Sequence, residues 1–248
     1  SENNAIKFHQ YISNYLQNDL SKITALEYFG YNCQNFIKNK NKLFKSSSDV
    51  GIYMQIPIYN KKIDDIIESW FEVLMTSNCN INENNIFVLN DKNNWKTFFE
   101  ARHSIPANAL EKSRKLKTYS ILTDTIVPPK KFKLFLKETH LILQSANIEY
   151  LLFGHLGDCH LHFHFIPTIE QQPAALEAYK KIIKKSSELG GVYSAEHGTG
   201  KRKRSDFLHC FGDNAVKQIK KTKSAIDPYF LLNQGNIIDF DQNNTYSK

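Results

Sequence analysis

Several features that mark particular protein classes are missing from this chain of 248 residues. No apolar run approaches the ~20 residues that a membrane-spanning helix needs. The ten glycines form no Gly-x-Gly-x-x-Gly motif and no Walker loop, so the chain has no dinucleotide-binding fingerprint of its own. Its first residues, Ser1-Glu2-Asn3-Asn4, are polar and lack the apolar centre of a signal peptide. We therefore expect a cytoplasmic protein, either free or peripheral at the inner face of the membrane. Because no Met begins the chain, we also expect a piece of a longer polypeptide.

Cysteine is sparse, and the basic residues are spread along the chain. Cys33, Cys79, Cys159 and Cys210 form no Cys-x-x-Cys pair, and without a secretory signal we expect free thiols. The net charge is +7, and the densest basic run is Lys201–Arg204. No aromatic interleaving or nucleic-acid module accompanies this run, so we expect no nucleic-acid partner. The run is either a solvated turn or a loop that attracts anionic substrate.

The order of the predicted elements indicates an α+β fold. After residue 50, strands and helices follow one another in the order strand, helix, strand, hairpin, helix, strand. This order favours an antiparallel sheet covered by helices on one face. Hydrophobic spacing predicts helices over 5–16, 24–38, 61–76, 94–102, 128–145, 174–188 and 214–225. It predicts strands over 50–59, 86–89, 119–127, 148–154, 160–166 and 192–195, with the first near a sheet edge because of Pro57.

Histidines are concentrated in one short stretch, His155-Leu156-Gly157-Asp158-Cys159-His160-Leu161-His162-Phe163-His164. From His160 onward, polar and apolar residues alternate, as in a half-buried strand whose successive side chains point to opposite faces. We expect His160, His162 and His164 to share one face, with His155 brought near them by the intervening turn. Imidazole binds zinc, iron, copper and nickel, so this stretch is a candidate metal site. Cys159 is either a fourth soft ligand or, as is commoner, a small turn residue.

A second group of polar residues, Ser194-Ala195-Glu196-His197-Gly198-Thr199-Gly200, follows a predicted strand. Adjacent residues on a strand point to opposite sides, so one of Glu196 and His197 can bind a metal while the other faces a substrate. The two glycines allow a tight turn after them. The alternative is a glycine turn that carries a solvated Glu and His.

Taken together, Gly154-His155-x-Gly157-Asp158-x-x-Leu161-His162 and Ala195-Glu196-His197-Gly198-x-Gly200 resemble motifs of the C-terminal, substrate-side domain of FAD-linked oxidases. That family includes D-lactate dehydrogenases, glycolate oxidase large subunits and D-2-hydroxyglutarate dehydrogenases. The two motifs are specific as a pair and weaker singly. The resemblance implies a ferredoxin-like cap domain, an antiparallel sheet covered by helices, with a helical C-terminal segment. Supporting matches extend it over about residues 22 to 238, at Ala25–Glu27, Ala101–Pro106, Asp124–Pro128 and Asp227–Gly235.

The resemblance also implies roles for individual residues. His155, His162 and Glu196 match the family's metal ligands, and His197 matches its catalytic base. Arg102 matches the arginine that holds the substrate carboxylate. The residue types suit these roles, because two imidazoles and a carboxylate leave open coordination positions for a substrate. Histidine can accept a proton near neutral pH, and arginine binds a carboxylate bidentately.

The chain departs from the family pattern at a few positions. His160 replaces an asparagine, and we expect it not to be a ligand. His164 stands where relatives often carry a polar residue that faces the substrate, so we expect it to line the substrate pocket. Leu122 takes the place of a substrate lysine found in some 2-hydroxyglutarate enzymes. This loss argues against a dicarboxylate substrate and favours D-lactate.

These observations lead to one functional hypothesis. The chain is expected to be the substrate- and metal-binding domain of an FAD-dependent D-2-hydroxy acid dehydrogenase, which passes a hydride to FAD and yields the 2-oxo acid. FAD would be bound mainly by an N-terminal domain outside this chain, so the chain alone would bind Zn, Fe or Mn without oxidising substrate. The electron acceptor is not indicated. We expect a helical lead-in over 1–21, the substrate and metal domain over 22–205, and a helical segment with a tail over 206–248 that packs near the flavin domain.

Two other functions are compatible with the same residues. One is a flavin-free accessory or binding module of the same fold, which an upstream flavin-binding domain in the natural reading frame would exclude. The other is a metallohydrolase, because His-rich strands with a Glu also serve hydrolysis. Hydrolysis of esters or phosphates without a flavin would favour that alternative.

Overall fold

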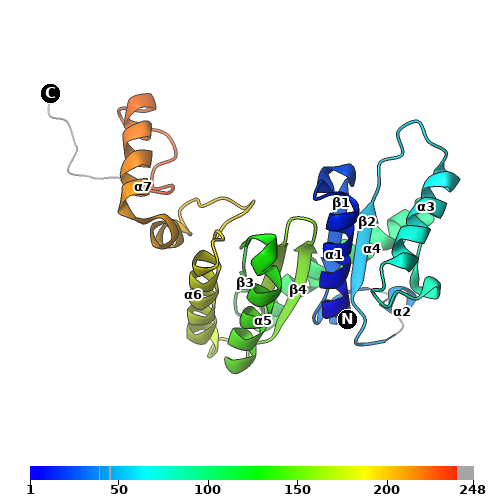
Figure 1. Cartoon of the computed structure of the whole chain (residues 1–248). Coiled ribbons are helices and arrows are strands. Elements are labelled where there is room, and N and C mark those ends of the chain that lie inside the picture. Colours follow the sequence, from blue (N-terminus) through cyan, green and yellow to red (C-terminus); the bar gives the residue numbers. More distant parts are fainter. Residues whose placement is uncertain (39, 45, 239–248) are drawn as a thin grey trace.

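The computed structural model describes residues 1–38, 40–44 and 46–238 and shows one five-stranded antiparallel sheet with helices on both faces (Figure 1). The strands lie in the order β2-β1-β4-β5-β3. Their bounds are β1 (Ala25–Phe29), β2 (Gly51–Gln55), β3 (Ile121–Leu122), β4 (Tyr150–His155) and β5 (His160–Phe165). The expected α+β class is thus confirmed, and β2, which precedes Pro57, is an edge strand as predicted.

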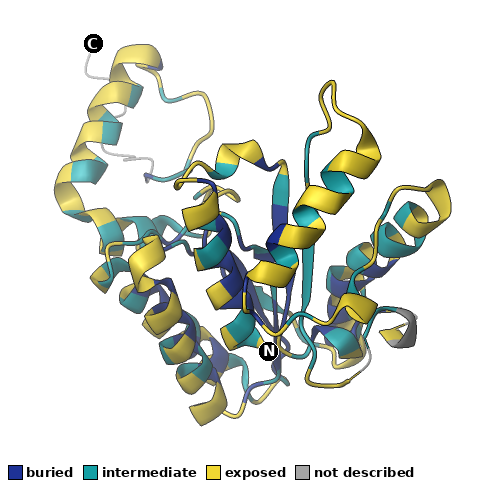
Figure 2. Cartoon of the chain, turned by 45° about the vertical axis from the view of Figure 1, so that its right-hand side comes forward, coloured by how far each residue is buried: buried dark blue, intermediate teal, exposed yellow. Residues whose placement is uncertain are grey.

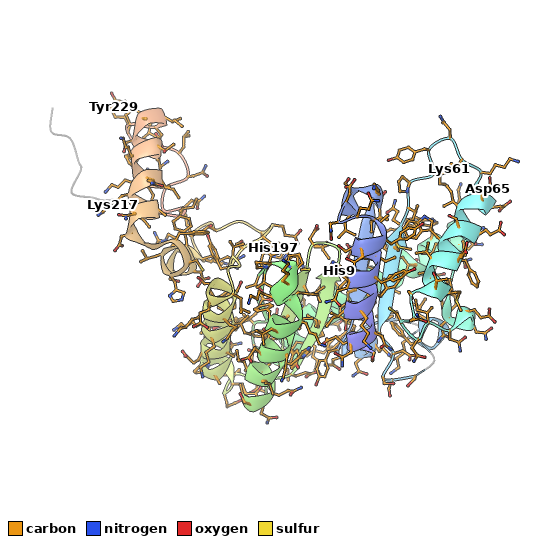
Figure 3. The ribbon with its side chains drawn as sticks, in the orientation of Figure 1. His9, Lys61, Asp65, His197, Lys217 and Tyr229 are labelled. Atoms are coloured by element: carbon orange, nitrogen blue, oxygen red, sulfur yellow. The ribbon has the colours of Figure 1, made fainter. Side chains whose placement is uncertain are left out.

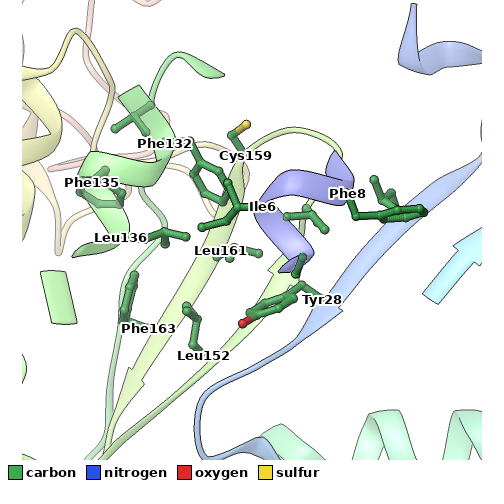
Figure 4. Packing of buried hydrophobic residues seen from close by; sticks show 14 of the residues in the cluster. Ile6, Phe8, Tyr28, Phe132, Phe135, Leu136, Leu152, Cys159, Leu161 and Phe163 are labelled. Carbon is green, nitrogen blue, oxygen red and sulfur yellow. The ribbon is translucent and has the colours of Figure 1, made fainter. Parts of the chain in front are cut away.

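One face of the sheet is covered by α1 (Glu2–Tyr15), α5 (Pro129–Ser145) and α6 (Gln172–Glu188). Pro129 begins α5, as expected from the tolerance of a helix's first turn for proline. Apolar side chains of α1 and α5 meet those of β4 and β5 in a continuous core, which Figure 4 shows from close by. The first helix therefore belongs to the main core, to which it contributes Ala5, Ile6, Phe8 and Ile12.

The opposite face of the sheet carries α4 (Lys92–Lys115), which differs from the expectation of helices on one face alone. Small and branched residues of α4 pack against the sheet there, and all three are buried: Ala101, Ile105 and Ala109. The sequence-based prediction ended this helix at Arg102, but it continues through Pro106. The extra length matters because α4 brings Arg102 over the sheet.

Three predicted elements differ from the structure. Residues 24–38, predicted as a helix, form strand β1 followed by a short 3₁₀ turn at Cys33–Asn35. Their apolar spacing fits a helix, but the segment is held between β2 and β4 by ladders that the local pattern cannot reveal. Residues 86–89, predicted as a strand, are irregular after the 3₁₀ turn Glu83–Asn85. The predicted strand over 192–195 amounts to isolated bridges, Asp124 to Ser194 and Ile126 to Val192.

The remaining helices lie at the periphery. They are α2 (Lys40–Leu43), α3 (Ile63–Thr76), α7 (Arg204–Ile226) and the 3₁₀ turn Leu20–Lys22. Helix α7 is kinked at Gly212, where φ is 73°, and it has no buried residue, as its exposed colouring in Figure 2 shows. Among the described residues, no helix combines the length and apolar character needed to cross a membrane.

Candidate metal centre and active site

The β4–β5 hairpin sorts its side chains by face, as the alternation predicts. Cross-strand partners are His155 with His160, Phe153 with His162, and Leu151 with His164. The three histidines of β5 share the face that α4 covers, together with His155. The alternating apolar residues Leu161, Phe163 and Phe165 join the core on the other face.

Two of these histidines point toward Glu196, which lies on the connection between α6 and α7. The Nε2 atom of His162 is 3.1 Å from one carboxylate oxygen of Glu196, and Nε2 of His155 is 3.4 Å from the other. The Nδ1–H of His162 donates to the Thr123 carbonyl at 3.0 Å, and that of His155 donates to Glu27 at 2.7 Å. Because Nδ1 is engaged by an acceptor in each ring, Nε2 is the nitrogen that faces the carboxylate and is available to a metal.

The spacing of these atoms suits a shared divalent ion. Ligand atoms about 2.1 Å from one metal, at the angles of tetrahedral or octahedral coordination, are about 3.0 to 3.4 Å apart. The distances between each imidazole nitrogen and Glu196 fall in that range. Burial lowers the pKa of His162 to about 4, so its ring is neutral and able to ligate at neutral pH. The residues present therefore fit a divalent metal held by His155, His162 and Glu196.

Glu27 of β1 is hydrogen-bonded to both His155 and Arg102. One oxygen accepts the hydrogen bond from His155, and the other accepts one from Arg102 of α4 at 2.9 Å. Burial by itself raises the pKa of Glu27, but the hydrogen bonds from His155 and Arg102 outweigh it and lower the net pKa. The hydrogen bond between Glu27 and His155 in turn raises the pKa of His155. An anionic carboxylate behind a ligating imidazole fixes the ring and increases its basicity.

His197 stands beside the proposed ligands on a tight turn. Its Nε2 lies 3.3 Å from Glu196, and the turn continues through Gly198 with φ of 71° and Gly200 with φ of 52°. The side chain is 42% exposed, and Figure 3 shows His197 on the connection that precedes α7. The imidazole is therefore close to the proposed ligands and open to a substrate.

The two predicted substrate residues have different surroundings. Arg102 is partly exposed and also lines an apolar cavity of about 720 Å³ together with Tyr53 and Phe98. His164 is only 3% exposed, and neither ring nitrogen has a partner among the described residues. Burial lowers its pKa to about 4. The ring of His164 thus has unused hydrogen-bonding capacity and is more deeply buried than Arg102.

Two further residues of the histidine stretch have other partners, although His160 lies close enough to His155, His162 and Glu196 to share an ion with them. The Nε2–H of His160 donates to Asp124 at 3.1 Å, so this nitrogen is already engaged. Cys159 is buried on the other side of the hairpin, where its sulfur lies 3.8 Å from His9 of α1. Among the described residues, Cys159 belongs to no group that could share a metal with these histidines.

The sequence reasoning missed the roles of Glu27 and Asp124. Asp124 is completely buried and contacts both the hairpin and the loop that carries Glu196 and His197. The available signal was a single acidic residue inside a segment predicted to pack, in the apolar Ala25–Phe29 and in Tyr119–Val127, where no other residue is charged. Buried carboxylates need partners, but the partners lie far away in sequence.

Comparison with known proteins identifies the family of the chain. Residues 22–237 match the family described as FAD linked oxidases, C-terminal domain. The mitochondrial D-lactate dehydrogenase (cytochrome) of Kluyveromyces lactis is 31% identical over 121 residues, which are 49% of this chain and 21% of that protein. The glycolate oxidase subunit GlcD of Bacillus subtilis is 31% identical over 145 residues, 57% of this chain and 30% of that protein. The D-2-hydroxyglutarate dehydrogenase of Escherichia coli is 29% identical over 119 residues, 46% and 11% of the two chains.

A solved structure supports the fold. The 4-ethylphenol oxidase from Gulosibacter chungangensis, in its isoeugenol complex, aligns with a TM-score of 0.57 at 13% identity, over 96% of this chain and 51% of that chain. The matched segments span less than a third of the D-lactate dehydrogenase and glycolate oxidase relatives. The family match covers most of the chain, and this chain therefore belongs to the FAD-linked oxidases, as their C-terminal domain.

Proposed function

We propose that this chain is the substrate- and metal-binding domain of an FAD-dependent D-2-hydroxy acid dehydrogenase, with D-lactate as the favoured substrate. One observation carries the proposal: the Nε2 atoms of His155 and His162 converge on Glu196, and His197 lies beside it. The names of the relatives point to the same class, since they are D-lactate, glycolate and D-2-hydroxyglutarate enzymes.

His155, His162 and Glu196 would hold the divalent ion. Two imidazoles and a carboxylate suit Zn, Fe or Mn and leave positions open for a substrate oxygen. Such an ion supplies Lewis acidity, which lowers the pKa of a bound 2-hydroxyl. The chain contributes the orientation of the two rings through the acceptors behind them, Thr123 and Glu27.

The remaining residues bind the substrate and move its proton. His197 would accept the 2-hydroxyl proton at Nε2, and the position of this nitrogen 3.3 Å from Glu196 supports that role. Arg102 uses one nitrogen on Glu27, and a guanidinium has further N–H donors for the substrate carboxylate. FAD, bound mainly by a domain outside this chain, supplies the acceptor for the hydride that leaves the substrate's Cα.

The surroundings of His164 favour a small substrate side chain. Leu122 is its cross-strand partner in β3, and both residues are poorly exposed. A second carboxylate on the substrate would have to be buried against this apolar residue without a cation, which is costly. D-Lactate carries only a methyl group there.

The experiment is a substrate screen with the full-length protein that contains this chain, reconstituted with FAD. Flavin bleaching under anaerobic conditions is followed with D-lactate, L-lactate, glycolate and D-2-hydroxyglutarate. We expect D-lactate to reduce the flavin fastest and L-lactate not to reduce it. Reduction by L-isomers alone, or by none of the four acids, would contradict the proposal.

A further inference from the structure

The loop that carries Glu196 and His197 is attached to the sheet through one buried side chain, Asp124. The backbone N–H of His197 donates to one carboxylate oxygen of Asp124 at 2.9 Å, and that of Glu196 donates to the other at 3.3 Å. The N–H of Ala195 donates to the Asp124 carbonyl at 2.8 Å. Three consecutive peptide groups of the loop are thus held by one residue.

Side chains complete the environment of Asp124. Oδ2 accepts from the Ser194 hydroxyl at 2.6 Å and from Lys203 Nζ at 2.9 Å, and Oδ1 accepts from His160 Nε2 at 3.1 Å. Lys203 also donates to Ser194 at 2.9 Å. The two ends of the loop therefore contact each other as well as the carboxylate of Asp124. Lys203 is mostly buried, unlike its neighbours Lys201 and Arg202. The basic run noted in the sequence therefore has one member with a defined internal partner.

The number of these contacts decides what Asp124 does. A carboxylate offers about four lone-pair positions. Five donors reach Asp124, three at Oδ2 and two at Oδ1. No position is left for a metal, even though Asp124 lies within reach of His162 and Glu196. The side chain is completely buried, so the carboxylate depends on these donors and on the Lys203 charge.

We propose that Asp124, with Lys203 as its counter-ion, is the positioning residue that fixes Glu196 and His197 relative to His162. The inference rests on the proposed function for the roles of Glu196 and His197. It adds that the loop's geometry is set by a charge pair rather than by regular secondary structure, since residues 194–203 contain no strand or helix. Oδ1 of Asp124 also lies 3.7 Å from Nδ1 of His197, on the side of that ring away from Glu196.

The first test uses Co²⁺ binding to the 248-residue chain, which needs no flavin. The variants are Asp124→Asn and Lys203→Met, with Lys201→Met as the matched control because it removes the same charge from an exposed position. We expect both loop variants to bind one Co²⁺ with affinity 10- to 100-fold weaker, as for other residues behind metal ligands, and the control to bind as wild type. Circular dichroism checks the fold, and Lys203→Met decides the outcome if Asp124→Asn does not fold.

Two Co²⁺ results overturn the proposal: unchanged affinity in a folded loop variant, or complete loss of the ion in folded Asp124→Asn, which would make Asp124 a ligand.

The second test measures turnover of D-lactate by the full-length protein at saturating metal. Positioning requires kcat per metal-loaded protein to fall 10- to 100-fold with KM changed less than about 3-fold. A merely structural role would lower thermal stability and leave this kcat unchanged, which would overturn the proposal. If wild type binds Co²⁺ but oxidises no 2-hydroxy acid, the proposed function fails while the Co²⁺ comparison still judges Asp124.

Discussion

The imidazole of His197 is stacked on that of His162, with ring centroids 5.1 Å apart and planes 8° apart. His162 comes from a strand inside the sheet, whereas His197 comes from a loop 35 residues later in the chain. Their parallel rings both direct Nε2 toward the same oxygen of Glu196, at 3.1 Å and 3.3 Å. A proposed metal ligand and a proposed proton acceptor thus share one carboxylate, which is the relationship that the proposed chemistry requires.

Replacement of Glu27 by Gln should weaken metal binding. Glu27 accepts hydrogen bonds from His155 and Arg102, and the amide loses the charge that holds both. We expect the dissociation constant for Zn²⁺ to rise about 10- to 100-fold, as for other carboxylates behind ligating histidines. Competition with a chromophoric chelator measures the change. Glu100→Gln on the exposed side of α4 is the control, and equal affinities for the two variants would contradict this role.

Replacement of His164 by Leu should stabilise the metal-free protein at pH 7. Both ring nitrogens lack partners among the described residues, and an unpaired buried polar group costs about 1 to 3 kcal/mol. We expect urea unfolding in the presence of EDTA to show an increase of about 1 kcal/mol in the free energy of unfolding. The full-length enzyme should at the same time show a raised KM for D-lactate. Lower stability together with unchanged KM would contradict both roles.

The same residue should make stability depend on pH. The pKa of His164 is lowered from 6.5 to about 4 by burial, so the unfolded chain binds more protons than the folded one between these values. His164 therefore causes no pH dependence above pH 6.5, where its ring is neutral in both states, and it destabilises the fold progressively as the pH falls toward 4, by about 3 kcal/mol at most. Urea unfolding with EDTA across this window should show a shallower slope for His164→Leu than for wild type. Identical slopes would show that His164 titrates normally.

Replacement of Gly154 by Ala should disturb His162. Gly154 has φ of +140°, and a Cβ there would lie 2.9 Å from the His160 carbonyl oxygen and 3.0 Å from the His162 ring. We expect a loss of about 1 to 3 kcal/mol in the free energy of unfolding, because a side chain is strained in this region. Zn²⁺ affinity should fall as well. Gly157→Ala is the control, since its Cβ would make an ordinary 3.5 Å contact with Leu26, and equal effects in the two variants would argue against a special role for Gly154.

The elements that the sequence predicts well are those whose signal is local. The alternation from His160 to Phe165 identifies strand β5 and both of its faces, and Pro128-Pro129 marks the start of α5. Within the proposed site, His155, His162, Glu196, His197 and Arg102 could be selected because their motifs resemble a family. The structure brings the first four together and links Arg102 to His155 through Glu27.

What the sequence could not provide depends on distant partners. Residues 25–29 were predicted as helix because Leu26, Phe29 and Cys33 have helical spacing, yet their hydrogen bonds go to β2 and β4. The role of Glu27 could therefore not be predicted from local sequence, because its hydrogen-bond partners are 75 and 128 residues away. Asp124 likewise depends on donors from residues 160 and 194–203. Such contacts arise only when the chain has folded, and no local periodicity reports them.

The central claim is that His155, His162 and Glu196 form one divalent metal site. The most direct measurement is metal content and Co²⁺ binding of the purified chain, wild type against His155→Ala, His162→Ala and Glu196→Ala, with exposed His103→Ala as the control. We expect one ion per wild-type chain, retention in the control, and a loss of at least tenfold in affinity for each of the three variants. Unchanged metal content in all three folded variants would contradict the claim.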